Sequence, residues 1–170
     1  MDRKLIGKIV NNNLNSNVMD KHIYNVDINW TQERKGMMCS PELNKTDTNE
    51  RNCIEVATPP EFSSGMPNIW SPEHLFTAAV SSCLMTTFLA IAEYSKLDFT
   101  SFKCGSKGIL DKIDGKFVMA EVFLFPEVII ADEKQRGRAE RILEKSEKAC
   151  LISNSITSKV SMEPKIIVQN

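Results

Sequence analysis

The chain has 170 residues, of which 42% are apolar and 25% are charged, which is the balance of an ordinary globular protein. This length predicts a single domain that can bury a core without disulfides or metals. The chain carries 21 basic and 22 acidic residues, for a net charge of −1. The basic residues are scattered, which argues against nucleic acid as a partner.

The first part of the chain predicts an arm, two strands and a loop. Residues 1–22 are rich in asparagine and are expected to form a loosely held arm before a domain at 23–170. Alternating apolar residues predict a half-buried strand over Ile23–Trp30, and Cys53–Ala57 predicts another short strand. The three prolines and one glycine of Thr58–Asn68 indicate a loop.

The clearest helix begins at Ser71-Pro72-Glu73. Ser supplies an N-cap oxygen, Pro suits the first helical position, and Glu complements the positive end of the helix dipole. From Leu75 to Ala92 the residues are apolar or small on nearly every side. This pattern predicts a central helix that is buried in a core or an interface.

Two strands are expected next, over Phe99–Asp111 and Lys116–Ile130. Asp114-Gly115 lies between them, and this dipeptide is favoured in hairpin turns.

A second helix is expected from Asp132, because Asp132 and Gln135 form a variant of the capping box. Its apolar stripe consists of Ala139, Ile142, Leu143, Ser146 and Cys150. A final strand, interrupted at Pro164, is expected over Ile156–Val168. Helices that separate groups of strands predict an α+β fold.

The five cysteines lie at positions 39, 53, 83, 104 and 150. They contain no C-x-x-C pair, and neither His lies at ligand spacing from a Cys, so no metal site is predicted. No segment was expected to reach the roughly 18 apolar residues that cross a bilayer, and no signal peptide is recognised. The protein is therefore expected in the cytoplasm, away from membranes, with its thiols kept reduced.

Cys83 and Cys150 fall on the apolar faces of the two expected helices. Free cysteine is among the most buried residue types, so packing alone would explain either position. Cys39, Cys53 and Cys104 lie in strand-like stretches without a motif. They are interpreted as packing residues, because a free cysteine behaves as a small apolar side chain.

Three separated segments carry motifs, namely Tyr24–Gly36 (Y-N-V-D-I-N-W-T-Q-E-R-K-G), Ser71–Cys83 and Cys150–Ile156. Together they resemble the organic hydroperoxide resistance / osmotically inducible protein C (Ohr/OsmC) family. Ser71–Cys83 (S-P-E-H-L-F-T-A-A-V-S-S-C) resembles the helix start that precedes the family's reactive Cys. Cys150–Ile156 (C-L-I-S-N-S-I) is similar to the segment around the family's second Cys, with Leu151 in place of the usual Pro. Tyr24–Gly36 resembles the strand and turn that carry an active-site Arg, here Arg34.

The resemblance implies an OsmC-like fold with two long helices packed against antiparallel sheets, in an intertwined homodimer. It also implies an antioxidant, thiol-dependent peroxidase of the oxidative stress response. In that chemistry Cys83 attacks an organic hydroperoxide, Arg34 stabilises the thiolate and the leaving alkoxide, and Glu73 holds the Arg. Cys150 then closes an intramolecular disulfide, and a lipoyl-type dithiol restores both thiols. No cofactor is implied.

The spacing of Glu73 and Cys83 favours a dimeric site. Ten residues on one helix separate them by about 15 Å along the axis and turn them by about 80°. One Arg34 would reach both on a single helix only under strain. Two helices packed antiparallel across a two-fold axis would instead bring Glu73 of one chain near Cys83 of the other.

Two other functions remain open from the sequence. The chain could be a non-catalytic OsmC-like dimer that binds an apolar small molecule, with its thiols serving as packing. It could also be a thiol-based redox sensor. His22 and His74 are interpreted as ordinary polar residues; the alternative for His74 is a contact with the pocket, because it shares the first helical turn with Glu73.

Overall fold

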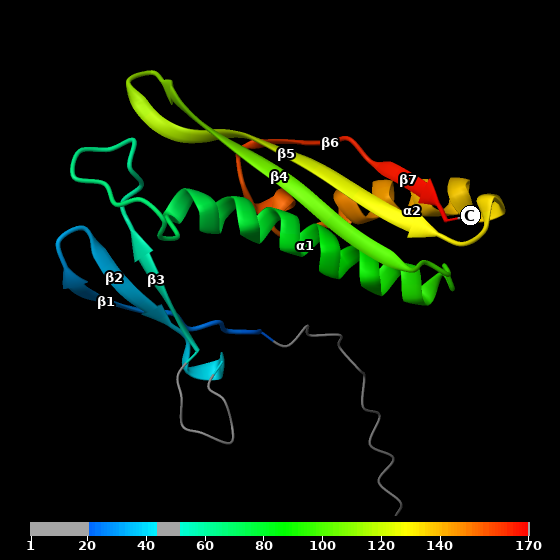
Figure 1. The fold of residues 1–170 in the computed structure, drawn as a ribbon, viewed down its shortest axis with the longest axis horizontal. Coiled ribbons are helices and arrows are strands. Elements are labelled where there is room, and N and C mark those ends of the chain that lie inside the picture. The colour runs from blue at the N-terminus through cyan, green and yellow to red at the C-terminus, as the bar shows by residue number, and fades with distance from the viewer. Residues whose placement is uncertain (1–20, 44–51, 170) are drawn as a thin grey trace, which may run out of the picture.

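A computed structural model describes residues 21–43 and 52–169 (Figure 1). The predicted arm lies outside these ranges except for residues 21 and 22. The helices and strands, in chain order, are β1 (Asp27–Gln32), β2 (Lys35–Cys39), β3 (Cys53–Ala57), α1 (Pro72–Tyr94), β4 (Ser101–Ile113), β5 (Lys116–Ile130), α2 (Arg136–Ala149), β6 (Lys159–Met162) and β7 (Lys165–Val168). The mixed α+β class predicted from the sequence is confirmed.

The strands form two sheets, which Figure 1 shows on either side of the start of α1. The first is antiparallel, in the order β1-β2-β3. In the second, β4 pairs antiparallel with β5, and both β6 and β7 pair with β5 in parallel. The expectation of purely antiparallel sheets is therefore wrong. The chain crosses over through α2 after β5, and this connection returns β6 in the direction of β5.

The hairpin of β4 and β5 turns where the sequence predicted. Asp114 and Gly115 both have positive φ, 49° and 79°. Positive φ at both central residues is the mark of the tight turn that Asp-Gly favours between antiparallel strands. The five buried residues that alternate along β5 are Val122, Leu124, Pro126, Val128 and Ile130.

The helix α1 is longer than predicted but starts where expected. The Ser71 side chain accepts a hydrogen bond from the His74 backbone N–H at 3.4 Å, so Ser71 is the N-cap. The prediction of burial all round is wrong for the single chain. Only one stripe is buried, consisting of Val80, Leu84, Phe88 and Ala92. Met85 and Leu89 are 38% and 41% exposed, because none of the described helices and strands covers that face.

Length and composition alone would also allow α1 to cross a membrane, contrary to the expectation that no segment could. In the structure α1 packs along the second sheet and α2, as a core helix does (Figure 1). Contact with β4 is close at Gly108, where a Cβ atom would lie 2.3 Å from the Thr77 hydroxyl. A side chain at position 108 would therefore have to displace the side chains of Thr77 and Met119.

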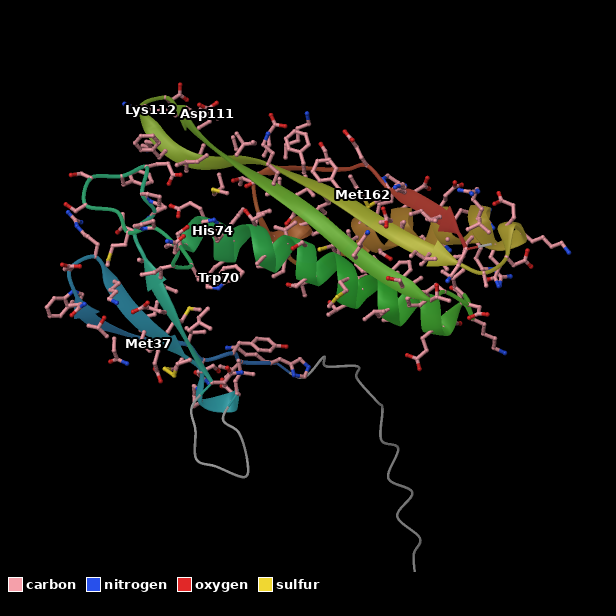
Figure 2. All side chains as sticks on the ribbon, in the orientation of Figure 1. Met37, Trp70, His74, Asp111, Lys112 and Met162 are labelled. Carbon is pink, nitrogen blue, oxygen red and sulfur yellow. A yellow bond between two sulfur atoms is a disulfide. The ribbon has the colours of Figure 1, made fainter. Side chains whose placement is uncertain are left out.

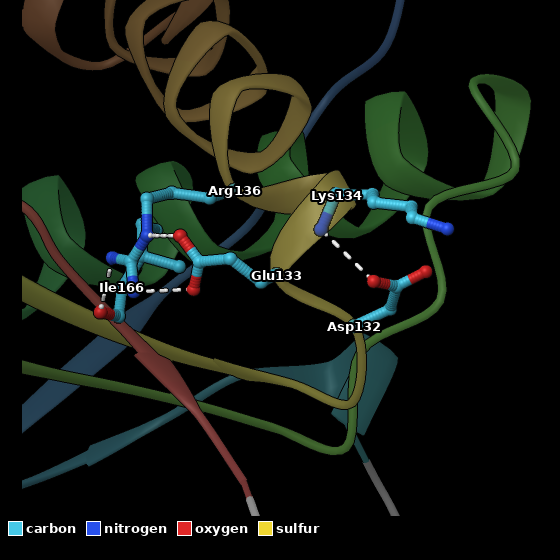
Figure 3. Close-up of polar contacts among 5 residues, drawn as sticks. All are labelled: Asp132, Glu133, Lys134, Arg136 and Ile166. Atoms are coloured by element: carbon cyan, nitrogen blue, oxygen red, sulfur yellow. Dashed lines mark hydrogen bonds and ion pairs between the residues drawn. The ribbon is translucent and has the colours of Figure 1, made fainter.

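The second helix begins later than predicted. Glu133–Gln135 form a single 3-10 turn, and Asp132 caps this turn by accepting a hydrogen bond from the Lys134 N–H at 2.9 Å. Arg136 then pairs with Glu133 and donates a hydrogen bond to the Ile166 carbonyl at 2.9 Å (Figure 3). These contacts fasten the start of α2 to β7. The predicted apolar stripe is confirmed, since Ala139, Ile142, Leu143, Ser146 and Cys150 are all buried.

The first sheet differs most from the sequence-based expectation. The predicted strand is shifted to β1, and it is exposed at every residue rather than half-buried. Trp30, for example, is 76% exposed. The strand β2, on which Figure 2 labels Met37, was not predicted.

Cys39 and Cys53 form a disulfide, so their interpretation as reduced packing thiols is wrong. The antiparallel register of β2 and β3 places the two residues directly opposite each other.

Candidate active site

Cys83 and Cys150 come together at the junction of the two helices. Cys83 lies in α1 and is half-buried, whereas Cys150 follows the last residue of α2 and is fully buried. The Ile152 backbone N–H, two residues after Cys150, donates a hydrogen bond to the Cys83 sulfur, with an N–Sγ distance of 3.5 Å. The turn that carries Cys150 therefore lies against Cys83, and the more accessible of the two thiols is the one on α1.

Polar contacts hold the turn that carries Cys150. The Asn154 N–H donates to the Cys150 carbonyl at 3.0 Å, and the Asn154 side chain donates to the Lys148 carbonyl at 2.9 Å. The Ser155 hydroxyl donates to the Leu151 carbonyl at 2.8 Å. Leu151, at the position of the usual Pro, is 68% exposed. Backbone and side-chain hydrogen bonds therefore define this turn without a proline.

The surroundings of the two thiols shift their pKa values in opposite directions. Burial pushes the pKa of Cys83 upward, but hydrogen bonds from Cys150, the Ile152 and Leu151 backbone and the Thr87 side chain outweigh burial. The pKa of Cys83 consequently falls below its usual value. Burial raises the pKa of Cys150, and its hydrogen bond to Cys83 raises that pKa further. The arrangement therefore favours a Cys83 thiolate next to a protonated Cys150 thiol, because the donor stabilises the charged form of its acceptor.

Glu73 lies in the first turn of α1, and its Oε2 atom is buried without a hydrogen-bond partner in the described part of the chain. It lines a hollow of about 620 Å³ between the 58–70 loop, α1 and the β4–β5 hairpin. In Figure 2, His74 and Trp70 lie together at this end of α1, and their ring centroids are 6.2 Å apart. His74 also lines the hollow, and its Nδ1 atom is 2.8 Å from the Ser71 hydroxyl.

Arg34 does not meet the other predicted site residues within one chain. It lies in the exposed turn between β1 and β2, where its carbonyl accepts a hydrogen bond from the Thr58 N–H at 3.0 Å. Arg34 lines a separate hollow with Trp30. Within residues 21–43 and 52–169, no ion pair joins Arg34 to Glu73. Arg34 is also not among the groups that shift the pKa of Cys83. A single chain therefore joins the thiol pair but leaves the Arg and the Glu apart.

Sequence reasoning missed two groups at the sulfur of Cys83, namely Thr87 and the backbone N–H of Ile152. Thr87 could have been found, because it follows Cys83 by four residues on the same helix face. The N–H of Ile152 belongs to a turn far along the chain and has no sequence signal.

Cys104 is half-buried against the core, and burial raises the pKa of its thiol. In the described residues, no three His, Cys, Asp or Glu side chains could hold a metal ion together.

The fold and the two neighbouring cysteines place the chain among α+β proteins that carry a pair of thiols between two helices. Residues 65–165 match the family model described as OsmC-like protein, and the chain belongs to this family. The family predicted from the three sequence motifs is therefore confirmed.

A curated relative is the uncharacterized protein YmaD of Bacillus subtilis (strain 168). It is 25% identical over 148 residues, which cover 85% of this chain and 92% of YmaD. A solved OsmC-like protein of unknown function from Vibrio cholerae has a TM-score of 0.74 at 22% identity, covering 85% of this chain and 99% of that one.

Two solved structures are of organic hydroperoxide resistance proteins. The one from Elizabethkingia anophelis has a TM-score of 0.67 at 19% identity, and it covers 89% of this chain and 99% of its own. The other, OhrB of Bacillus subtilis, has a TM-score of 0.59 at 16% identity, with coverage of 85% and 98%. At these identities the solved structures establish the shared fold.

Proposed function

We propose that this protein is a thiol-dependent peroxidase that reduces organic hydroperoxides through Cys83 and Cys150. The observation that carries the proposal is that two free thiols, Cys83 and Cys150, meet where α1 packs against the turn after α2, and that the Ile152 N–H donates a hydrogen bond to the Cys83 sulfur. Burial raises the pKa of Cys83, but its hydrogen bonds outweigh burial and lower that pKa. A thiolate is the nucleophile in peroxide reduction, and a nearby thiol is what converts its product to a disulfide. The organic hydroperoxide resistance proteins that share this fold support the same chemistry.

The reaction consists of three balanced steps. The Cys83 thiolate attacks one oxygen of the hydroperoxide, the O–O bond breaks, and the alkoxide leaves and takes a proton as an alcohol. Cys83 is then a sulfenic acid, which condenses with the Cys150 thiol to form a disulfide and water. A dithiol reduces this disulfide by exchange and becomes a disulfide itself.

A second copy of the chain would complete the site. One carboxylate oxygen of Glu73 is buried and has no hydrogen-bond partner among the described residues, and a buried polar atom is costly unless it is hydrogen-bonded. Arg34 is exposed and offers a planar donor fork that suits a carboxylate. We infer that a homodimer brings Arg34, Glu73 and Cys83 together across its interface, where Arg34 stabilises the leaving alkoxide.

Exposed apolar surface supports the homodimer. Met85 and Leu89 line the uncovered face of α1, and the exposed apolar residues around β1 are Ile23, Tyr24, Val26, Ile28 and Trp30. Apolar patches of this kind mark interfaces when they are contiguous. A homodimer would cover both the exposed face of α1 and the apolar residues around β1.

The hollow beside Glu73 favours the second candidate, a dimer that binds an apolar small molecule. It has a volume of about 620 Å³, in the range of small-molecule sites, and its apolar walls include Phe62, Trp70, Leu110 and Met119.

The experiment that separates the two candidates measures the consumption of cumene hydroperoxide by the full chain with dihydrolipoamide as reductant. Multiple turnovers support the peroxidase. Binding of cumyl alcohol with no turnover would support the ligand-binding dimer instead.

A further inference from the structure

Cys39 and Cys53 occupy directly opposite positions on neighbouring strands at one end of the first sheet. Cys39 is the last residue of β2 and Cys53 the first of β3, and their Cα atoms are 4.3 Å apart. Such a separation is close to the roughly 4.5 Å of a non-hydrogen-bonded pair in an antiparallel ladder. The backbone itself therefore places these two sulfurs within bonding reach.

We propose that Cys39 and Cys53 are a second redox couple, which a dithiol reduces and a small disulfide re-forms, independently of Cys83 and Cys150. Neither cysteine belongs to the site described above.

One of the two sulfurs, that of Cys53, is accessible to a reducing thiolate. A thiolate attacks a disulfide sulfur from the side opposite the sulfur that leaves, and access to that side controls the rate. Cys39 lies on the central strand, is 8% exposed, and has Asp27 of β1 beside it. Cys53 lies on β3, at the edge of the sheet, and is half-buried. The line from Cys39 through Cys53 therefore leads outward from the edge strand, so Cys53 is the sulfur open to attack.

The pair also stays together when reduced. The four further residues of β2 also have partners on β3, namely Met38 opposite Ile54, Met37 opposite Glu55, Gly36 opposite Val56 and Lys35 opposite Ala57. Lys35 also forms an ion pair with Glu55, with an N–O distance of 2.6 Å. This ladder holds the register without the covalent bond, so oxidation of the reduced pair is an intramolecular step that needs little reorganisation.

The redox step balances in electrons and protons. A thiolate of the dithiol bonds to the Cys53 sulfur, the disulfide breaks, and Cys39 leaves as a thiolate and takes up a proton. The second thiol of the reductant then displaces Cys53 from the mixed disulfide. Two electrons and two protons pass from the dithiol to the protein, and the reductant becomes a disulfide. Oxidation is the reverse exchange. In the cytoplasm, where we propose that the protein acts, a disulfide is usually transient or redox-sensing rather than a permanent staple.

The test uses the full chain with Cys83→Ser and Cys150→Ser, so that its result does not depend on peroxidase activity. The protein is equilibrated with mixtures of dihydrolipoamide and lipoamide, quenched with acid, unfolded and labelled with N-ethylmaleimide. Peptide mass spectrometry then gives the labelled fraction of each remaining cysteine. Cys104, which is a free thiol in the same chain, serves as the internal control.

We expect the labelling of Cys39 and Cys53 to rise and fall together, with one midpoint that is the same when approached from either side. Cys104 should be labelled alike in every mixture. Labelling of both residues in every mixture would overturn the proposal, because the pair would then not form a disulfide under these conditions. Protection in every mixture would also overturn it, because the bond would then be an inert cross-link.

Discussion

The Cys150 thiol donates a hydrogen bond to the Cys83 sulfur, and this contact shifts the pKa values of the two residues in opposite directions. Burial raises the pKa of each thiol, but in Cys83 this hydrogen bond, with those from Ile152, Thr87 and Leu151, reverses the effect. For Cys150, burial raises the pKa and the same hydrogen bond raises it further. Two chemically identical side chains thus differ in acidity, and Cys83 is the more acidic of the pair.

The first prediction concerns the pH dependence of Cys83. The thiolate is the reactive form, so alkylation of Cys83 rises as the pH passes upward through its pKa. Because that pKa is lowered, the midpoint should lie below the ordinary value of about 8.5. Cys150→Ala removes the main hydrogen-bond donor and should move the midpoint up. Cys150→Ser keeps a donor and should move it less.

The alkylation rate is measured by mass spectrometry of the Cys83 peptide between acid and alkaline pH. Cys104→Ser is the matched control, since it removes a half-buried thiol outside the pair, and it should leave the midpoint unchanged. An unchanged midpoint in Cys150→Ala would mean that Cys150 does not set the acidity of Cys83.

The second prediction separates the roles of the two thiols. Cys83→Ser should reduce peroxide consumption to the rate without enzyme, since Cys83 supplies the nucleophile in the proposed mechanism. Cys150→Ser should permit one oxidation of Cys83 and then stop, because the sulfenic acid has no neighbouring thiol. Sulfinic acid at Cys83 should then accumulate with excess peroxide, as seen by mass spectrometry. Sustained turnover in both variants would contradict the assignment.

The third prediction concerns Arg34. Removing a donor that stabilises developing negative charge commonly costs about 10²–10³ in rate, so Arg34→Ala should slow peroxide attack by about that factor. Arg34→Lys should recover part of the loss, because an ammonium cannot engage Glu73 through two parallel hydrogen bonds. Lys35→Ala is the control, since Lys35 is the adjacent cation and pairs with Glu55. Equal rates in Arg34→Ala and Lys35→Ala would remove Arg34 from the mechanism.

The fourth prediction is that the protein is a homodimer whose interface includes β1. Trp30 is 76% exposed in the single chain, and Trp30→Glu would place a charge in the proposed interface. Light scattering at micromolar concentration should give a dimer for the unchanged protein and a monomer for Trp30→Glu. Arg138→Glu, on the exposed face of α2, should remain a dimer. A monomeric unchanged protein would leave Arg34 and Glu73 apart.

The sequence predicted those elements whose signals are local. Ser71 caps α1, Asp114 and Gly115 form the hairpin turn, and the stripe that ends at Cys150 is buried. In each case the physical cause lies within a few neighbouring residues. The thiol pair was predicted as well, but through family resemblance rather than through periodicity.

The failures have causes outside the local sequence. Met85 and Leu89 have the same character as the buried residues of α1, and only the missing cover leaves them exposed. The Cys39–Cys53 bond depends on the register of β2 against β3, to which the intervening segment gives no clue. The parallel pairing of β6 and β7 depends on the crossover through α2.

The central claim is that Cys83 and Cys150 reduce an organic hydroperoxide together. The most direct measurement adds one equivalent of cumene hydroperoxide to protein in which Cys83, Cys104 and Cys150 are free thiols, without reductant, and follows both the alcohol formed and the disulfide-linked peptides. We predict one equivalent of cumyl alcohol and a new disulfide that joins Cys83 to Cys150, with Cys104 unchanged. Unreacted hydroperoxide and free thiols at both Cys83 and Cys150 would contradict the account.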